Sequence, residues 1–442
     1  MTPRRAVLQV LMNGRLVGRL RNSAHGVLSF QYDHAWLDFA GRRAISLSMP
    51  LAGHAYSGRI VENYFDNLLP DSQPLRNRLQ ARVGADSGRC FDLLARIGRD
   101  CVGALQLLPE GEQVDIRSVQ AAQPLTEEEI AAILRNYQTM PLGVDLEADF
   151  RISLPGAQEK TALLYHEGRW CRPAGATPTS HLFKLPIGNL GRSGIDLSES
   201  IENEWLCQRI LQAFDMPVAP AEMMVFGGRN VLVVQRFDRR WAEDGSWLMR
   251  LPQEDLCQAT GTYGQMKYES DGGPGMQKIM DVLLGSLRSR EDRATFMKAQ
   301  LLFWMLAAID GHAKNFSIFL LAGGLYHLTP LYDVISAHPL VAARQIDRQR
   351  VSMAMAVHGK NRHYRWDLIS RRHWLENARK CHFPAEEMDR IITECCDRLE
   401  GAIDQVCGDL PPGFPEGISS SIFAGMQEAR DRLREVSGGR SR

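Results

Sequence analysis

The stretch between Leu301 and Asp333 limits the possible folds of this 442-residue chain more than any other. It opens with the longest apolar run of the sequence, Leu301–Ile309, which predicts a buried helix that stops at Asp310. Two short β-favouring segments joined by a pair of glycines follow over residues 316–328 and predict a hairpin. We therefore expect polar residues of the loop and of the segment after the hairpin to converge.

The polar residues of this stretch have the spacing that phosphoryl transfer requires. Asp310 and Asn315 are separated as in the D-x-x-x-x-N loop of protein kinases, and Asp333 follows the predicted hairpin. Such chemistry needs a carboxylate that orients the attacking hydroxyl and accepts its proton, and oxygen ligands that hold Mg²⁺. An Asp-Gly pair alone usually marks a turn, and a single asparagine is usually a cap or loop residue. The combination is much harder to obtain by accident and favours a phosphotransfer site.

Residues 153–160 (SLPGAQEK) form a second candidate site between two strand-like segments. Small residues let backbone N–H groups approach phosphate oxygens closely, so this loop could bind a nucleotide. The segment matches neither the Walker A pattern nor the glycine-rich loop of protein kinases. An ordinary hairpin loop is the alternative interpretation.

Lys184 is a third candidate because it lies in an otherwise apolar predicted strand over residues 181–185. A lysine in such a strand is costly unless it is paired, and kinases use one to hold the α- and β-phosphates beside a helical carboxylate. Residues 198–214 predict an amphipathic helix that carries Glu204 as the candidate partner, with Glu202 as its competitor. A lysine at a sheet edge is the alternative.

The fourth candidate is the charged segment 235–240 (QRFDRR), which follows a predicted buried strand over residues 231–234. Its place in the chain resembles the hinge between two kinase lobes, where backbone groups bind adenine. The alternative is a charged strand end with no role in binding.

The charge of the chain restricts nucleic-acid binding to a local patch. Lys and Arg number 52 and Asp and Glu number 52, so the net formal charge is zero. Residues 344–380 nevertheless carry ten basic against three acidic residues, an excess of seven positive charges, with Tyr364, Trp366 and Trp374 interleaved. Such a patch can bind phosphate backbones. A solvated face balanced by neighbouring acidic helices is the alternative.

The remaining pattern predicts an α+β chain. Strands are expected over residues 6–12, 15–20, 27–32 and 44–49, the first two joined by an Asn13-Gly14 turn, with helices over 75–82 and 90–97. The polar stretch 109–124 predicts a linker, and Thr126 with Glu129 predicts a capping box that starts a helix. We expect an N-terminal subdomain over residues 1–120, a region over 121–250 with the nucleotide-covering loop, and a mainly helical region over 251–442.

Cysteine usage and hydropathy predict a cytoplasmic protein. The nine cysteines are scattered, odd in number and without a C-x-x-C pair, which indicates a reducing compartment and no zinc site. The longest apolar run is far below the roughly 20 residues that span a bilayer. The N-terminus lacks the apolar stretch of a signal peptide.

At these residues the chain resembles the HipA serine/threonine kinases, the toxins of bacterial type II toxin–antitoxin modules. Matching motifs occur along nearly the whole chain: residues 63–71 (NYFDNLLPD), 97–103 (IGRDCVG), 149–153 (DFRIS), 156–160 (GAQEK), 236–241 (RFDRRW), 251–257 (LPQEDLC), 267–275 (KYESDGGPG) and 310–315 (DGHAKN). The resemblance implies a bilobal protein-kinase-like fold with an additional N-terminal α+β subdomain.

The resemblance also implies roles for individual residues, with ATP and Mg²⁺ as cofactors. Asp310 corresponds to the catalytic base, Asn315 and Asp333 to the Mg²⁺ ligands, and Ser153 to an autophosphorylated serine whose modification ejects its loop. The residues expected to contact ATP are Leu154, Pro155, Gly156, Ala157, Gln158, Glu159, Lys160, Lys184, Gln235, Arg236, Phe237, His312, Lys314 and Asn315. Leu154 and Pro155 replace smaller residues of the family and would stiffen the loop, and Gln235 replaces a glutamate.

The family further implies partners. Its substrate is glutamyl-tRNA synthetase, and loss of that enzyme leads to growth arrest and persistence. Its antitoxin is HipB, a helix-turn-helix dimer that binds operator DNA, and Arg379 and Lys380 are expected DNA contacts of the complex. One alternative is a pseudokinase that acts only as a corepressor, against which the retained Lys184, Asp310 and Asp333 argue. Another is a small-molecule phosphotransferase.

Overall fold

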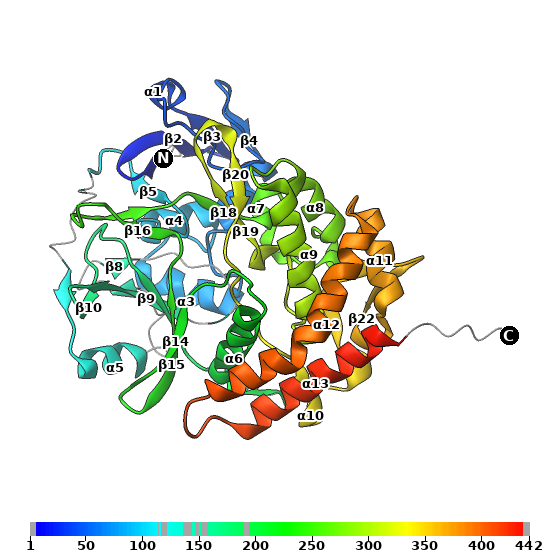
Figure 1. Cartoon of the computed structure of the whole chain (residues 1–442). Coiled ribbons are helices and arrows are strands. Elements are labelled where there is room, and N and C mark those ends of the chain that lie inside the picture. Colours follow the sequence, from blue (N-terminus) through cyan, green and yellow to red (C-terminus); the bar gives the residue numbers. More distant parts are fainter. Residues whose placement is uncertain are drawn as a thin grey trace. The chain divides into compact units, whose positions relative to one another are not determined.

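The chain forms two compact units in the computed structural model (Figure 1). The structure describes residues 6–113, 115, 122–135, 144–145, 150–151, 158, 160–189 and 194–435. The first unit comprises residues 1–185, 220–266 and 317–326, and the second comprises residues 186–219, 267–316 and 327–442. Helices and sheets are mixed, which confirms the predicted α+β class. The division of the chain at residues 120 and 250 stays a prediction.

The first unit begins with an antiparallel sheet in the strand order β4-β3-β2-β1-β5. Its strands are β1 (Ala6–Met12), β2 (Arg15–Asn22), β3 (Leu28–Tyr32), β4 (Tyr56–Ser57) and β5 (Leu105–Pro109). Asn13 and Gly14 between β1 and β2 have φ angles of 47° and 77°. Positive φ at both positions is the turn geometry that Asn-Gly favours, so the predicted hairpin is confirmed.

Four helices belong to the same part of the first unit: α1 (His34–Leu37), α2 (Arg59–Asp66), α3 (Gln73–Val83) and α4 (Cys90–Ile97). Phe30 on β3 and Phe65 on α2 are fully buried, with ring centroids 6.0 Å apart. The sheet and the helices therefore share one apolar core. The helices predicted over residues 75–82 and 90–97 are confirmed.

The strand predicted over residues 44–49 is wrong, because this segment forms only one isolated β-bridge. Its backbone donors bond to side chains instead of to a neighbouring strand. The Ile45 N–H donates to the Tyr32 hydroxyl over 2.9 Å, and the Leu47 N–H donates to the Glu254 carboxyl over 2.7 Å. These distant side chains outweigh the local strand preference.

A second antiparallel sheet has the order β14-β15-β11-β9-β10-β6. Its strands are β6 (Gln123–Pro124), β9 (Lys160–His166), β10 (Arg169–Arg172), β11 (His181–Lys184), β14 (Ala221–Phe226) and β15 (Arg229–Gln235). Helix α5 (Glu127–Arg135) shares the core of this sheet. Its predicted capping box is confirmed, because Glu129 N–H donates to Thr126 Oγ1 and Thr126 N–H donates to Glu129 Oε2.

Short elements complete the first unit. They are β7 (Val144–Asp145), β8 (Phe150–Arg151), β16 (Arg239–Trp241), β17 (Leu248–Arg250), β18 (Gln253–Asp255), α7 (Leu256–Ala259) and β19 (Ser317–Leu320). Strand β19 pairs with β18 and with β20 (Tyr326–Leu328), which forms the hairpin predicted over residues 316–328. Gly323 and Gly324 turn this hairpin with φ angles of 76° and 78°.

The second unit is mainly helical, as predicted for the C-terminal region. Its helices are α6 (Ser200–Ala213), α8 (Met276–Leu284), α9 (Ser289–Met305), α10 (His338–Ala342), α11 (Arg371–Lys380), α12 (Ala385–Gly408) and α13 (Glu416–Arg434). Helix α12 packs against α6, α9 and α13 (Figure 1). Its strands are β12 (Gly188–Asn189), β13 (Asp196–Leu197), β21 (Ser352–His358) and β22 (Arg362–Arg365). In the described part of the chain, no helix has the length and apolar character to cross a membrane.

Helix α9 ends four residues before the end of the apolar run that predicted it. The Ala308 N–H donates to the Phe303 carbonyl over 2.7 Å, and the Ala307 N–H donates to the Trp304 carbonyl over 3.0 Å. Ala307 takes a φ of 47°, which is unusual for a residue with a side chain. This pair of bonds is a Schellman stop, so residues 306–309 leave the helix although they are apolar.

The cysteines are free thiols, and eight of the nine are buried. Burial raises the pKa of the Cys90 and Cys101 thiols to about 12. Such thiols stay protonated at neutral pH and behave as small apolar side chains.

Candidate active site

The polar loop after α9 is held by its own backbone hydrogen bonds. The His312 N–H donates to the Asp310 carbonyl over 2.8 Å, and the Asn315 N–H donates to the His312 carbonyl over 2.9 Å. Gly311 lies against Phe303, where a Cβ would come within 2.6 Å of the ring. Glycine therefore lets the loop pack closely on α9, and the Asp310 side chain emerges 54% exposed.

Asn315 links the two aspartates that flank it in the sequence. Its Nδ2 donates to the Asp310 carbonyl over 2.8 Å and reaches the Asp333 carbonyl at 3.5 Å. The structure thus brings Asp310, Asn315 and Asp333 together, as their spacing predicts. The roles of base and metal ligand stay predictions.

Asp333 has a φ of 57°, a left-handed conformation that costs energy for a residue with a side chain. Strain of this kind is concentrated at functional sites, where the surrounding structure enforces it. Because the Asn315 Nδ2 is already engaged by backbone carbonyls, its Oδ1 is the atom left for a ligand. An amide oxygen and a carboxylate are hard donors, so these two residues fit Mg²⁺.

Two further residues of this loop and two tyrosines outside it complete the polar cluster. His312 and Lys314, predicted to contact ATP, are both buried, and His312 Nε2 lies 3.6 Å from the Asp310 carboxylate. The Lys314 carbonyl accepts a bond from the Tyr332 hydroxyl over 3.2 Å. The hydroxyl of Tyr268 donates to the Asp310 carboxylate, a contact that the sequence reasoning missed because the two residues are 42 positions apart.

Lys184 lies inside the second sheet of the first unit. Strand β11 runs between β9 and β15, so the alternative of an edge lysine is wrong. In register, Lys184 faces Lys160 on β9 and Leu232 on β15. Gln158 donates from Nε2 to the Leu185 carbonyl over 2.6 Å at the same end of these strands. Lys184 is buried at 3% exposed, so this pair of lysines forms no exposed cationic surface, and contact of either lysine with phosphate stays a prediction.

The candidate carboxylate partners of Lys184 are buried on α6 in the second unit. Glu204 and Glu202 are 1% and 7% exposed. Asn203 between them is bonded twice to Ser336, with Nδ2 to the Ser336 carbonyl and Oδ1 from the Ser336 N–H, both over 2.8 Å. This pair fastens α6 to the segment that follows Asp333. The pairing of Lys184 with either glutamate stays a prediction.

Six predicted residues of the nucleotide loop lie outside the described residues. They are Ser153, Leu154, Pro155, Gly156, Ala157 and Glu159. The autophosphorylation of Ser153 and the contacts of this loop with ATP therefore stay predictions.

The hinge-like segment is anchored in the interior. The Gln235 N–H donates to the Pro220 carbonyl over 2.8 Å and the Arg236 N–H to the Ser180 carbonyl over 2.9 Å, and the Arg236 carbonyl accepts a bond from the Arg239 N–H over 3.2 Å. The Phe237 ring packs edge-on against Phe319 at 5.8 Å. Arg236 is 4% exposed, and a role of this segment in binding adenine stays a prediction.

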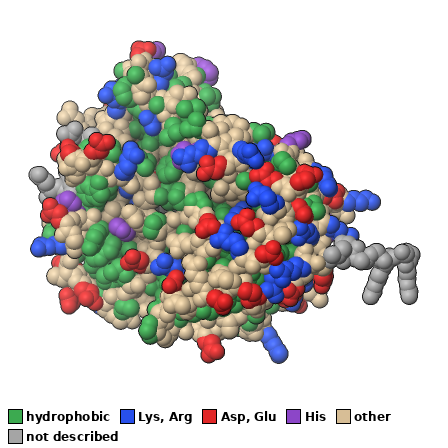
Figure 2. Space-filling model, in the orientation of Figure 1, with side chains coloured by type: hydrophobic (Ala, Val, Ile, Leu, Met, Phe, Trp, Pro, Cys, Tyr) green, Lys and Arg blue, Asp and Glu red, His purple; other side chains and the backbone are tan. Residues whose placement is uncertain are grey.

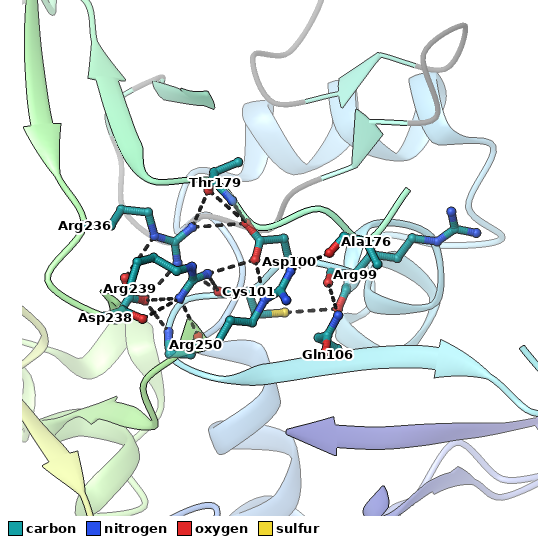
Figure 3. A network of polar contacts seen from close by, with 12 residues as sticks. Arg99, Asp100, Cys101, Gln106, Ala176, Thr179, Arg236, Asp238, Arg239 and Arg250 are labelled. Carbon is teal, nitrogen blue, oxygen red and sulfur yellow. Dashed lines mark hydrogen bonds and ion pairs between the residues drawn. The ribbon is translucent and has the colours of Figure 1, made fainter. Parts of the chain in front are cut away.

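Arg236 belongs to a buried ion network that joins it to the 97–103 motif (Figure 3). Asp100 contacts Arg236 at 3.3 Å, Arg239 at 2.8 Å and Arg250 at 2.9 Å. Asp238 binds Arg236 at 2.8 Å and Arg239 at 3.0 Å. The network therefore holds the hinge-like segment to the N-terminal part of the first unit.

The pKa values in this network follow from burial and from its excess of positive charge. Burial alone raises the pKa of Asp100, but Arg239, Arg250 and Arg236 outweigh it and hold the pKa well below its ordinary value. Burial, and then the neighbouring Arg236, lowers the pKa of Arg239 to about 10. The same pairing lowers the pKa of Asp238 and raises that of Arg236, so these two groups, like Asp100 and Arg239, are charged at neutral pH.

The basic segment 344–380 is partly neutralised. Arg348 pairs with Glu428 on α13, Arg371 with Asp389 on α12 at 2.8 Å, and Arg365 with Asp367 at 2.6 Å. Basic and acidic side chains also alternate over the C-terminal helices on the face drawn in Figure 2. These pairs favour the alternative of a balanced, solvated face.

The aromatic part of that prediction is wrong for two residues. Trp366 and Trp374 are 3% and 0% exposed, and both pack against Trp304 on α9. Buried indoles cannot stack on bases. Arg379 is exposed, whereas the Lys380 ammonium donates to the Gly359 carbonyl, and DNA contact by either residue stays a prediction.

The fold and the loop together define a protein of the protein-kinase-like class. Two family models match the chain: the HipA N-terminal domain over residues 8–108 and the HipA-like C-terminal domain over residues 152–403. The chain belongs to the HipA family of serine/threonine kinase toxins.

Individual relatives agree with this assignment. Y4mE of Sinorhizobium fredii, described as a candidate kinase, is 35% identical over 440 residues, which cover 98% of this chain and 99% of Y4mE. The serine/threonine-protein kinase toxin HipA of Shewanella oneidensis is 27% identical over 304 residues, 66% of each chain. A solved HipA chain from that organism, in complex with HipB and operator DNA, has a TM-score of 0.81 at 21% identity over 97% of each chain. This last match confirms the predicted fold.

Proposed function

We propose that this chain transfers the γ-phosphate of ATP, with Mg²⁺, to a serine or threonine hydroxyl of another protein. The observation that carries the proposal is the Asn315 amide, which bonds to the carbonyls of both Asp310 and Asp333. It holds an exposed carboxylate beside two oxygen ligands in one hydrogen-bonded unit, which is the arrangement that phosphoryl transfer requires. A hydroxyl on a protein surface can approach the Asp310 carboxylate because over half of that side chain is exposed.

Each residue has a defined part in this proposal. Asp310 orients the acceptor hydroxyl and takes its proton, while Lys184 and Lys160 neutralise phosphate oxygens. Asn315 and Asp333 hold Mg²⁺ through side-chain oxygens, and the bound ion neutralises charge on the phosphates. Phosphotransfer then depends mainly on how firmly the chain positions these groups.

The family supports a more specific biological role. We propose a cytoplasmic toxin that phosphorylates glutamyl-tRNA synthetase and thereby arrests growth, with Ser153 as its own site of inactivation. A helix-turn-helix antitoxin of the HipB type would bind it and operator DNA, by analogy with the complex of the Shewanella protein. Arg379 is exposed and is the proposed DNA contact of the complex.

The test is phosphate transfer from radiolabelled ATP by the purified full-length chain, first to glutamyl-tRNA synthetase and then to a cell lysate. We expect a labelled acceptor with the wild-type chain and none with Asp310→Asn. Asp404→Asn, an exposed aspartate on α12, is the matched control and should label like the wild type. Labelling of the lysate but not of the synthetase would reject the substrate and keep the kinase.

Growth arrest separates this proposal from the corepressor alternative. Expression of Asp333→Ala without the antitoxin should leave growth unaffected, because a metal ligand is lost. Arrest that persists in this variant, together with no transfer by the wild type, would contradict the proposed function.

A further inference from the structure

The motif 267–275 has no part in the function proposed above, yet it reaches the centre of the candidate site. The Tyr268 hydroxyl donates a hydrogen bond to Oδ1 of Asp310. The same ring meets His312 edge-on, with centroids 5.1 Å apart and planes at 82°. Tyr268 therefore contacts both polar side chains at the start of the loop.

The backbone on either side of Tyr268 is firmly held. Its carbonyl accepts bonds from Asp271 N–H over 3.1 Å and Gly273 N–H over 2.9 Å, which close a short 3₁₀ turn over Glu269–Asp271. These bonds fix the main chain from which the tyrosine ring projects.

The next residue anchors this turn to the helical unit. The carboxylate of Glu269, which is buried, accepts bonds from Ala356 N–H over 2.7 Å and His358 Nε2 over 3.1 Å on β21. A Cβ at Gly275 would collide with the Glu269 carboxylate, so glycine is needed at this position, which follows the 3₁₀ turn. The tyrosine thus projects from a rigid support rather than from a loose loop.

Asp310 needs such support because its own surroundings constrain it little. An exposed aspartate side chain samples several rotamers, and each unproductive rotamer lowers the fraction of time in which it can accept a proton. The tyrosine hydroxyl occupies Oδ1 and leaves Oδ2 for the acceptor hydroxyl. His312 Nε2, 3.6 Å from Oδ1, lies beyond hydrogen-bond distance and orients the carboxylate less strictly.

We propose that Tyr268 is a positioning residue that holds the Asp310 carboxylate by Oδ1 so that Oδ2 receives the proton of the acceptor. This inference rests on the proposed kinase function. In the step, the acceptor oxygen bonds to the γ-phosphorus, the bond from that phosphorus to the β,γ-bridging oxygen breaks, and ADP leaves. The acceptor proton passes to Oδ2 of Asp310, and Tyr268 keeps its own proton throughout.

The test is steady-state kinetics of Tyr268→Phe, which keeps the ring packing on His312 and removes only the hydroxyl. We expect kcat to fall about tenfold, as for one lost orienting bond, while KM for ATP stays within about twofold. Tyr56→Phe is the matched control, because the Tyr56 hydroxyl donates a hydrogen bond to the Pro50 carbonyl and lies far from Tyr268 in the sequence. It should retain wild-type kinetics, and all three proteins should melt at the same temperature.

A second variant tests whether Tyr268 acts through Asp310. In the Asp310→Asn background the residual transfer rate should not fall further when Tyr268→Phe is added, because the carboxylate to be oriented is gone. Additive losses would overturn the inference, as would a kcat for Tyr268→Phe equal to that of Tyr56→Phe or above it. A joint rise in KM and loss of melting temperature would assign a structural role instead. Absence of transfer by the wild type would contradict the proposed function itself.

Discussion

Asp100 and Asp310 are both aspartates surrounded by polar partners, and their environments are opposite. The Asp100 side chain is 3% exposed and touches three guanidinium groups, so every oxygen lone pair is directed to the protein. The Asp310 side chain is largely exposed, and the polar side chains of Tyr268 and His312 lie beside it.

The difference teaches that charge and motif alone do not identify a reactive carboxylate. A buried carboxylate whose oxygens are bonded by arginines and by Thr179 stabilises the fold, since removing one charged partner leaves uncompensated charge in the interior. A carboxylate with an oxygen left open can exchange a proton with another molecule. The contacts therefore give the motif around Arg236 a part in stabilising the first unit, whereas the chemical role of the loop around Asp310 stays a proposal.

The largest expected effect concerns Asp310, the exposed aspartate of the comparison. Asp310→Asn should lower the rate of phosphate transfer about 10³-fold or more, because the amide cannot take the acceptor proton. Its free energy of unfolding should change by less than about 0.5 kcal/mol, since an exposed side chain contributes little to folding. Parallel kinetics and urea unfolding check both halves, and a large loss of stability would break the comparison.

Substitution of the buried Asp100 should instead lower the stability of the fold. Asp100→Asn leaves Arg236, Arg239 and Arg250 with a single carboxylate, Asp238, and should reduce the free energy of unfolding by about 3–5 kcal/mol. Urea unfolding of the full chain measures this loss, with Asp404→Asn as the exposed control. A loss of unfolding free energy below about 1 kcal/mol would show that the ion network contributes little to the stability of the fold.

A second buried carboxyl sharpens the comparison through its pH dependence. Glu254 lies on β18 near Ser46, and burial raises its pKa to about 8. The folded chain thus keeps a proton that the unfolded chain loses near pH 4.3, so this group makes stability fall as pH rises from about 5 to 8. The pKa of Asp100 is shifted downward, and its contribution is lost only as pH falls below about 4.

Glu254→Gln isolates that effect, because the amide keeps the shape and cannot ionise. Relative to the wild type, the variant should gain about 1 kcal/mol of unfolding free energy for each pH unit between 5 and 8. Urea unfolding at pH 5, 6, 7 and 8 measures the trend. A difference that stays constant with pH would mean that Glu254 is ionised in the folded chain.

The smallest expected effect concerns Gly103, whose backbone borders the ion network of Asp100 and Asp238. Gly103 has a φ of 73°, its N–H donates to Asp238 over 2.7 Å, and a Cβ would lie 2.8 Å from the Gln253 carbonyl. Gly103→Ala should cost about 1–3 kcal/mol of stability through strain and a displaced bond. Thermal unfolding measures the cost, with Gly401→Ala on α12 as the control, because a Cβ there meets nothing.

Local features were predictable where neighbouring residues decide the outcome. The Asn13-Gly14 turn, the Thr126 capping box and the hairpin over residues 316–328 depend on atoms a few positions apart. The association of Asp310 with Asn315 was also predictable, because five residues of loop keep both ends together.

Features with distant partners were not predictable. The strand expected over residues 44–49 is prevented by Tyr32 and Glu254, and the hinge-like Arg236 is captured by Asp100, 136 positions away. Likewise, nothing local to the motif 267–275 indicates that its tyrosine reaches the catalytic loop.

The sequence by itself determined the order of elements, the turns and caps, and the set of polar residues in the candidate catalytic loop, because these follow from spacing and local backbone preference. Only the tertiary structure decided which charged motif is buried and which stays open. That choice depends on partners from distant segments and on the removal of water from around them, and neither is encoded in the residues next to an aspartate.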